Sequence, residues 1–510
     1  MGRGDREISD VLVVGGGLAG LTLALQLRKR RPDLDIRIVD PQRRPAAERT
    51  STVGESLSEV GSHYLREIIG LSDHLDAQQV PKFGLRFFVG SQDDLGDRFE
   101  IGPLHPKICE MDGGRFIGLP LRTHQVDRGR LENELARRCQ AGGIVLLEGT
   151  RLDRVEIDPA GHKVFLTGDH GGELRARWIV FASGGETPGH AIQRRPLNHR
   201  IRAAWARVEG DLDVGTWSTN PSFAARTLHG LRRHSTNHMM GGGYWTWIIA
   251  LPSDATSVGV VVDPDVLEFK PASYAEMVGW LAERDWRTAH ELAIATPVDG
   301  DFHVTELNAA VAEQCFSAER WAVVGQAAAA IDVLYSSGAD LIALGNTLLV
   351  HIIEREFEGG RIAGRCAVAE RVFAGFAEGF ADIYRGQYRH FGSPAHVATK
   401  VAWDSALYFG FHTLLFRHGL FGDPEFLVEI RPEVRAVQNA QARVQGRLRQ
   451  GDFQPLVDVG GGTVEWGAIE WLMDSYFAAK EQPDQRAVLA ALRASVARLE
   501  RLARRVEGLG

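Results

Sequence analysis

Four residues near the start of the chain have the types and the spacing that a dinucleotide site needs. Gly15, Gly17 and Gly20 lie in the run VLVVGGGLAG, and Asp40 ends the next apolar run, DIRIVD. Gly15 permits a tight turn, Gly17 lets the backbone approach a pyrophosphate, and Gly20 lets a helix pack closely on a strand. Asp40 follows at the distance where a carboxylate accepts hydrogen bonds from ribose hydroxyls. A helix that begins at this turn also presents free N–H groups to phosphates. The pattern therefore predicts a bound dinucleotide.

Two later segments have the form of strands that end beside the same dinucleotide. They are WIVFASGG at 178–185 and WAVVGQAAAAID at 321–332. Taken singly, each is equally consistent with a buried strand that is capped by small residues. The glycine motif alone suits NAD as well as FAD, and the two later segments favour FAD. The candidate cofactor contacts in them are Ala182, Gly184, Gly325, Gln326 and Asp332.

A lysine, two tryptophans and a small-residue turn also have types that could do chemistry. Lys82 follows a proline in PKFGLRF, where an isolated lysine is ordinarily a solvated surface charge. Trp245 and Trp247 alternate along an apolar run, so both point to one face of a strand, as aromatic core residues often do. The turn at 336–338 offers successive N–H groups to an anion, or a serine cap to a helix.

Together these pieces resemble the flavin-dependent halogenases, within the wider class of FAD monooxygenases related to hydroxybenzoate hydroxylase. The similarity spans roughly residues 8–360. The family has a WxWxIP signature, and Trp-Thr-Trp-Ile-Ile-Ala at 245–250 matches five of its six positions. The other matching pieces are VGGGLAG at 14–20, VGES at 53–56, PKFGLRF at 81–87, HQVDR at 124–128, STNHMMGGGYWTWIIALP at 235–252 and DVLYSSG at 332–338.

The resemblance implies a role for each of these residues. Reduced FAD and O2 convert chloride or bromide to hypohalous acid, which Lys82 holds by hydrogen bonding or as a chloramine. Trp245 and Trp247 stand between the flavin and the substrate chamber and disfavour direct oxygen transfer to the ring. The expected halide ligands are the backbone N–H groups of Ser336, Ser337 and Gly338. The remaining expected flavin contacts are Gly54, Glu55 and Ser56 of a strap, together with Gln125 and Arg128.

Four positions depart from the family's pattern. They are Phe181 and Gln326 in place of Asp, and Ala250 and Val333 in place of Pro. Because most flavin contacts are made by the backbone, we expect FAD binding to survive these changes. The acid of tryptophan halogenases is missing after Asp332, where Tyr335 lies. The resemblance therefore favours a phenol, pyrrole or aniline-like ring over free tryptophan.

Two alternatives to a halogenase remain open at this point. An FAD-dependent aromatic hydroxylase would use the flavin oxidant directly on the ring, and Lys82 with the tryptophan pair argues against it. A non-catalytic FAD-binding partner in a biosynthetic assembly would retain FAD without turnover. The four departures keep both alternatives in view.

An α/β fold is needed to position these residues. We expect a Rossmann-type FAD-binding domain, like that of hydroxybenzoate hydroxylase, over residues 1–360. An antiparallel substrate sheet is inserted at about 83–121 and 200–305, and a helical C-terminal region covers 361–510. The expected strands include 11–14, 35–40, 144–148, 151–157 and 162–167, and the expected helices include 18–30, 127–141 and 484–506.

The composition of the 510-residue chain restricts its partners and its compartment. The net charge is −8 without a long basic run, so a nucleic-acid partner is not expected. We find no apolar run long enough to span a bilayer, and the short polar N-terminus does not predict a signal peptide. The four cysteines are scattered, which predicts no metal site and a reducing cytoplasm. The resemblance implies a small aromatic substrate, free or tethered to a carrier protein, and a separate flavin reductase.

Overall fold

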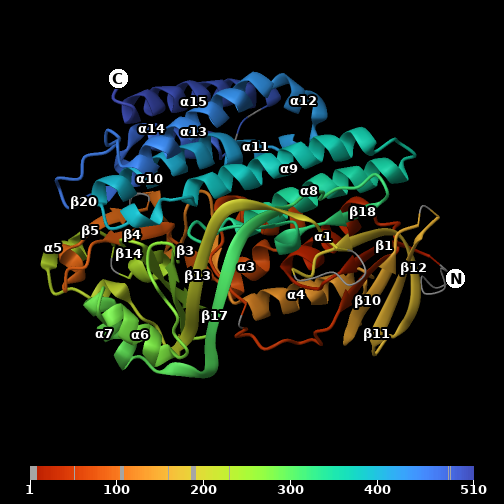
Figure 1. The fold of residues 1–510 in the computed structure, drawn as a ribbon, viewed down its shortest axis with the longest axis horizontal. Coiled ribbons are helices and arrows are strands. Elements are labelled where there is room, and N and C mark those ends of the chain that lie inside the picture. The colour runs from red at the N-terminus through yellow and green to blue at the C-terminus, as the bar shows by residue number, and fades with distance from the viewer. Residues whose placement is uncertain are drawn as a thin grey trace.

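The computed structural model describes residues 8–50, 52–103, 108–158, 160–184, 191–228, 230–480, 482 and 484–509. Two sheets lie side by side beneath a layer of C-terminal helices (Figure 1). The long antiparallel strands β13 (Arg194–Glu209) and β17 (Pro297–Ala312) run through the middle of this view. Gly185, the last residue of the second predicted cofactor segment, lies outside the described residues.

The first sheet is of the Rossmann type and contains the predicted dinucleotide motif. Its strand order is β10-β11-β12-β1-β2-β9, and β18 also pairs with β12. The neighbours β9, β2, β1, β12 and β18 are parallel, whereas β10 and β11 form an antiparallel extension. The strands are β1 (Ser9–Val14), β2 (Ile36–Asp40), β9 (Val145–Glu148), β10 (Thr150–Glu156), β11 (His162–Gly168), β12 (Gly172–Phe181) and β18 (Trp321–Val323).

Three helices pack on this sheet or on one another. They are α1 (Leu18–Arg30), α4 (Arg128–Ala141) and α8 (Gly338–Phe357). The predicted Rossmann-type α/β domain is confirmed, and α1 has the predicted bounds. The strand β1 forms because its run of branched apolar residues is buried between the layers, as expected of a central parallel strand.

The second sheet is the inserted one, and its order is β19-β17-β13-β16-β15-β14-β4-β5-β20. It is mostly antiparallel, but β14 pairs in parallel with β4, and β20 pairs in parallel with β5. Its strands, besides β13 and β17, are β4 (Leu85–Val89), β5 (Phe99–Gly102), β14 (Thr236–Gly241), β15 (Tyr244–Leu251), β16 (Ala255–Val262), β19 (Ala329–Ala330) and β20 (Thr463–Glu465). The structure thus adds a strand, β20, from the region expected to be helical, and continues β17 to Ala312, past the expected sheet boundary near 305.

Shorter elements connect the two sheets. The strand β3 (Val80–Lys82) pairs with β8 (Thr123–Gln125), and β6 (Glu110–Asp112) pairs with β7 (Arg115–Gly118). The helices α2 (Glu59–His63) and α3 (Ser72–Gln78) precede β3 along the chain, whereas α5 (Pro221–Ala225), α6 (Tyr274–Ala282) and α7 (Trp286–Ile294) lie between strands of the second sheet.

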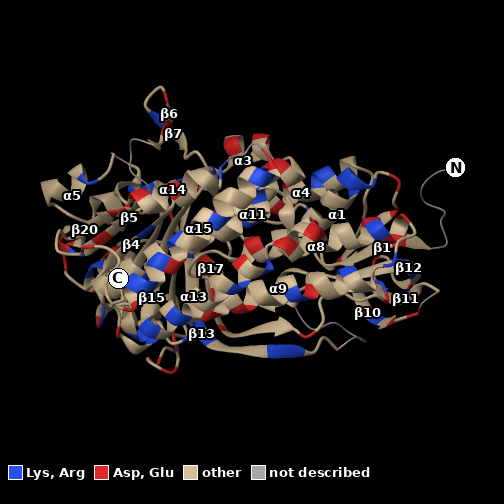
Figure 2. Ribbon diagram, turned by 90° about the horizontal axis from the view of Figure 1, so that it is seen from above, with Lys and Arg blue, Asp and Glu red and all other residues tan. Residues whose placement is uncertain are grey.

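The C-terminal region forms a helical layer, drawn in blue along the top of Figure 1. Its helices are α9 (Ala363–Tyr384), α10 (Pro394–Leu407), α11 (Leu414–Arg417), α12 (Pro424–Glu429), α13 (Arg431–Gln450), α14 (Glu470–Ala478) and α15 (Gln485–Val506). A π-helix at Tyr408–Thr413 continues α10. No helix within the described ranges is long and apolar enough to cross a membrane. Figure 2 shows Lys and Arg interspersed with Asp and Glu over the helices.

Candidate active site

The three predicted cofactor segments meet at one edge of the Rossmann-type sheet. Val14 of β1 pairs with Val39 of β2 on one side and with Phe181 of β12 on the other, and Phe181 pairs with Val323 of β18. The parallel strands therefore end together. Their carboxyl ends are where open α/β sheets bind ligands.

The glycines at this edge have the geometry that a dinucleotide needs. Gly15 has a positive φ of 115°, and a Cβ there would lie 2.7 Å from the carbonyl carbon of Ala182. A Cβ on Gly20 would lie 1.9 Å from the oxygen of Gly15. Gly17 differs, because a Cβ there would meet no atom within 4 Å, and as the N-cap of α1 it leaves the helix end without a side-chain cap. The open space and free N–H groups fit the pyrophosphate of FAD.

Asp40 and the third segment border the same space. Burial raises the pKa of Asp40, although its Oδ1 accepts a hydrogen bond from the backbone of Gln42 at 3.0 Å. Gly325 has a positive φ of 66°, and a Cβ there would lie 2.7 Å from that of Ala19 in α1. A Cβ on Gly184 would lie 3.5 Å from Oε1 of the exposed Gln326. The structure thus brings together the residues that were predicted to flank the dinucleotide.

The predicted flavin strap is held largely by two arginines from other elements, Arg128 of α4 and Arg207 of β13. Gly54 has a positive φ of 99°, and a Cβ there would lie 2.8 Å from the guanidinium of Arg128. Arg128 donates to the carbonyl of Val53 at 2.7 Å. The buried carboxylate of Glu55 forms an ion pair with Arg207 at 2.6 Å. Their contacts to FAD stay predictions.

Gln125 is fixed inside the protein beside the same strap. Its Nε2 donates to the carbonyl of Ala250 at 3.1 Å, and its backbone forms an isolated bridge with Ser56. Ala250, which replaces the signature proline, therefore supplies a carbonyl that holds Gln125. The backbone of Gln125 thus pairs with the strap, and the expected contact of Gln125 with the cofactor stays a prediction.

Lys82 is not a surface lysine, because only 3% of it is exposed. The strand pair β3–β8 places its Nζ 2.7 Å from the hydroxyl of Ser56 and 2.8 Å from the carbonyl of Leu57, and it donates to both. Burial lowers the pKa of Lys82 to about 8, against the opposing charges of Glu59 and Asp340. A lysine with this pKa exchanges between ammonium and amine near neutral pH, which suits either role expected of it.

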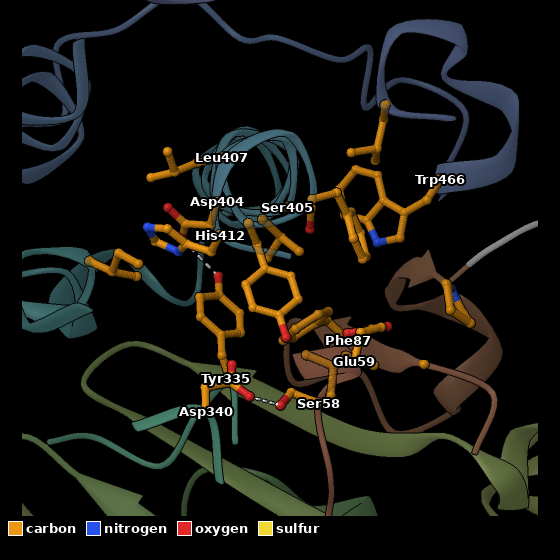
Figure 3. Close-up of a pocket in the computed structure, with 18 of the residues that line it drawn as sticks. Ser58, Glu59, Phe87, Tyr335, Asp340, Asp404, Ser405, Leu407, His412 and Trp466 are labelled. Carbon is orange, nitrogen blue, oxygen red and sulfur yellow. Dashed lines mark hydrogen bonds between the residues drawn. The ribbon is translucent and has the colours of Figure 1, made fainter. Parts of the chain in front are cut away.

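Lys82 lines a cavity between the inserted sheet and the C-terminal helices. Figure 3 shows Ser58, Glu59 and Asp340 on one side of this cavity, with Asp404, Ser405 and Trp466 across from them. The hydroxyl of Tyr335 donates to Asp404 at 3.0 Å. The rest of the wall is mostly aromatic and aliphatic, with Phe87, Phe380, Ile383, Val401, Leu407, Tyr408, Phe409 and Leu472. An apolar cavity with a few convergent polar groups is the usual form of a small-molecule site.

The two tryptophans share one face of β15, as predicted, with ring centroids 5.8 Å apart. The indole N–H of Trp245 donates to the Tyr388 hydroxyl at 2.9 Å, and that of Trp247 donates to Ser257 at 3.0 Å. Both rings are buried and neither belongs to the lining of the cavity that contains Lys82. Their position between the flavin and the substrate stays a prediction.

The predicted halide loop lies at the N-terminus of α8. Ser336 has a positive φ of 60°, and Ser337 is the N-cap of α8, although its side chain makes no cap hydrogen bond. A Cβ on Gly338 would meet no atom within 4 Å. The N–H of Ser336 is not free, because it donates to the carbonyl of Val333 at 3.1 Å. The loop therefore leaves the N–H groups of Ser337 and Gly338, with open space at Gly338, for an anion at the helix N-terminus.

Asp332 holds the start of this loop. Its Oδ1 accepts from the backbone of Leu334 at 2.9 Å. Its Oδ2 accepts from Tyr388 at 2.6 Å and lies 2.7 Å from Nε2 of His199. Asp332 thus links the loop to Tyr388, the partner of Trp245, and its contact with the cofactor stays a prediction.

Sequence reasoning missed the acids of the cavity, Glu59 and Asp340. Burial raises the pKa of Asp340 to about 7, and the hydroxyls of Ser58 and Tyr408 oppose this shift. Burial also raises the pKa of Glu59. Both acids lie in the first turn of a helix, where acids are common for reasons of helix stability alone. Only the assembled cavity distinguishes them.

Comparisons with known proteins agree with this geometry. Residues 13–74 match the family model "NAD(P)-binding Rossmann-like domain". The chain is 22% identical over 436 residues to a flavin-dependent halogenase of Dictyostelium discoideum, covering 78% of this chain and 69% of that protein. It is 24% identical over 350 residues to a 1H-pyrrole-2-carbonyl-[peptidyl-carrier protein] chlorinase of Pseudomonas fluorescens, covering 65% and 72% respectively.

A solved structure extends the likeness to nearly the whole fold. The structure of the halogenase PltM in complex with phloroglucinol and FAD has a TM-score of 0.64 with 14% identity, covering 97% of this chain and 96% of that one. This likeness includes the C-terminal helical layer, which the motifs did not cover.

Proposed function

We propose that this chain, a homologue of the flavin-dependent halogenases, chlorinates or brominates a small electron-rich aromatic ring through hypohalous acid held at Lys82. The observation that carries the proposal is the burial of Lys82 in the wall of an aromatic cavity, with its Nζ bonded to the flavin strap at Ser56. Burial of a lysine is energetically costly because its ammonium loses water, so the burial of Lys82 favours a functional role.

When FAD is bound and reduced, it supplies with O2 the oxidising equivalents that convert halide to hypohalous acid. The residues of this chain do the rest. The N-terminus of α1 binds the pyrophosphate near Gly17, and the loop at 336–338 holds the halide. Lys82 retains the hypohalous acid by donating a hydrogen bond, or by forming a chloramine with loss of water. The ring then attacks the halogen, loses a proton and regains its aromaticity.

The wall of the cavity is mostly aromatic and aliphatic, which suits an aromatic ring as the substrate. Closure of such a wall around the ring would limit the loss of hypohalous acid to water. The hydroxyl of Ser56 and the carbonyl of Leu57 both accept hydrogen bonds from the Lys82 ammonium, and these two bonds hold the lysine in place. We place the reaction in the reducing cytoplasm, with a separate flavin reductase as the source of reduced FAD.

Mass spectrometry of the products tests this function. The purified chain is given FAD, a flavin reductase with its nicotinamide donor, and chloride or bromide. It is then offered a panel of phenols, pyrroles and anilines, free and attached to a carrier protein. A product with the chlorine or bromine isotope pattern supports the proposal. Hydroxylated rings without halogen would instead identify an aromatic hydroxylase.

A further inference from the structure

The charged groups of the cavity are unevenly distributed. Lys82 stands at one end with Glu59 and Asp340. At the other end, Asp404 is balanced by Lys400, whose ammonium donates to it at 2.7 Å. Burial lowers the pKa of His412 to about 3, so this lining histidine is neutral at ordinary pH. The end that contains Lys82 therefore has two carboxyl groups for one ammonium.

These two carboxyl groups retain free acceptor capacity. Asp340 is 5% exposed, and its Oδ1 accepts from the Ser58 hydroxyl and from the backbone of Gly61. Its Oδ2 is buried without a hydrogen-bond partner. The side chain of Glu59 makes no hydrogen bond or ion pair to another side chain in the described part of the chain. A buried acceptor without a partner is costly, and a ligand that supplies a donor removes that cost.

We propose that Asp340 and Glu59 form the recognition end of the substrate cavity and select uncharged aromatic rings that bear an O–H or N–H donor, excluding rings that carry a carboxylate. This inference rests on the proposed function. A phenol hydroxyl that donates to Asp340 would lie beside Lys82, so the ring carbons next to the hydroxyl would face the held halogen. Above about pH 7, where Asp340 is ionised, a substrate carboxylate would meet like charge in a site of low dielectric, which is unfavourable.

Two probes with the same aromatic ring but different charge distinguish the effect of substrate charge on binding from the effect of ring reactivity on the rate. The probes are a resorcinol ring with a methyl ester and the same ring with a free carboxylate. The ester withdraws at least as much electron density as the carboxylate, so a preference for the ester cannot arise from ring reactivity. Calorimetric titration of the FAD-loaded chain at about pH 8, above the pKa of Asp340, gives both affinities, and product analysis at the same pH gives both rates.

The wild-type chain is expected to bind the ester at least about tenfold more tightly than the carboxylate, which corresponds to about 1.4 kcal/mol. This ratio is expected to fall toward one in Glu59→Gln and Asp340→Asn, and furthest in the double variant. Asp474→Asn is the matched control, because Asp474 lies on α14 and is paired with Arg498 outside the cavity. Its ratio should equal that of the wild-type chain.

Equal affinity for the two probes, or a preference for the carboxylate, would overturn the inference. A preference that persists in the double variant would overturn the assignment to these residues. FAD retention shows whether Asp340→Asn folds. If it does not fold, Glu59→Gln is used alone, because Glu59 is partly exposed and its substitution disturbs the fold less. If no halogenated product forms but the ester is still bound more tightly than the carboxylate, the proposed function is refuted. The assignment of Asp340 and Glu59 to substrate recognition is then retained.

Discussion

The ammonium of Lys82 lies 2.7 Å from the hydroxyl of Ser56 and donates a hydrogen bond to it. Ser56 belongs to the strap that is expected to contact the flavin, and Lys82 belongs to the cavity wall. The proposed catalytic group is thus tied to the cofactor side of the protein by one hydrogen bond. Removing an acceptor from a buried ammonium leaves a costly unsatisfied group, so the position of Lys82 depends on this strap.

FAD is expected to bind without covalent attachment, and Gly17→Val should abolish its binding. The new side chain strains nothing in the protein, because a Cβ at Gly17 meets no atom within 4 Å, but it occupies the space of the pyrophosphate. FAD absorbance retained after gel filtration measures the effect. Gly446→Val is the control, since a Cβ there also meets nothing. If Gly17→Val retains FAD as the control does, the site is wrongly placed.

NADPH alone should not reduce the bound flavin quickly. The sequence contains one dinucleotide fingerprint, at 14–20, and the proposed FAD site uses it. Anaerobic absorbance at the flavin band follows the reduction, first without and then with an added flavin reductase. Rapid bleaching without the reductase would point to a single-component hydroxylase.

Halide binding should depend on the backbone of the loop at 336–338 more than on the hydroxyls of its serines. Gly338→Val places bulk where a Cβ now meets open space, and should weaken halide use. Ser337→Ala removes a hydroxyl that makes no cap hydrogen bond, and should have a small effect. The dependence of product formation on chloride concentration gives the ranking. The reverse ranking would show that a hydroxyl holds the ion.

Asp340 should make the stability of the protein depend on pH. Its pKa is raised from 3.8 to about 7 by burial, so the folded protein holds its proton more strongly than the unfolded chain does. Stability from this group therefore falls as pH rises through about 4 to 7, by up to about 4 kcal/mol. The amide in the Asp340→Asn variant would not ionise, so the variant does not lose this stability. Its free energy of unfolding, compared with that of the wild-type chain, should therefore increase as the pH rises over that range. Urea unfolding at about pH 4.5 and at about pH 8 measures both proteins, and an unchanged difference would contradict the account.

Local patterns in the sequence predicted the parts of the site that lie close along the chain. The turn at Gly15, the helix at Leu18–Arg30 and the alternation of Trp245 and Trp247 follow from residue types and spacing. The pairing of β14 with β4 could not be predicted, because nothing local specifies which distant strand completes a sheet. Glu59 and Asp340 were missed for the same reason.

The C-terminal wall of the cavity was also beyond prediction. Tyr408 and His412 lie on a π-helix, and Trp466 follows β20. Their sequences read as ordinary apolar helix and loop. Only the packing of this layer on the inserted sheet shows that they complete the cavity. The residues of the cofactor edge were therefore predictable, and those of the substrate wall were not.

Substitution of Lys82 tests the central claim most directly. Lys82→Ala should retain FAD and continue to oxidise reduced flavin with release of peroxide. The hydrogen bonds of Lys82 go to Ser56 of the strap and to the adjacent Leu57, whereas the pyrophosphate is expected at Gly17 and the helix that follows it. Halogenated product should fall below detection, a loss far beyond the tenfold that about 1.4 kcal/mol represents. Lys82→Arg should fail as well, since a guanidinium keeps the charge but does not form a chloramine readily. Product formation by Lys82→Ala near the wild-type rate would contradict the role of Lys82, and unchanged hydroxylation of the same ring would contradict halogenation itself.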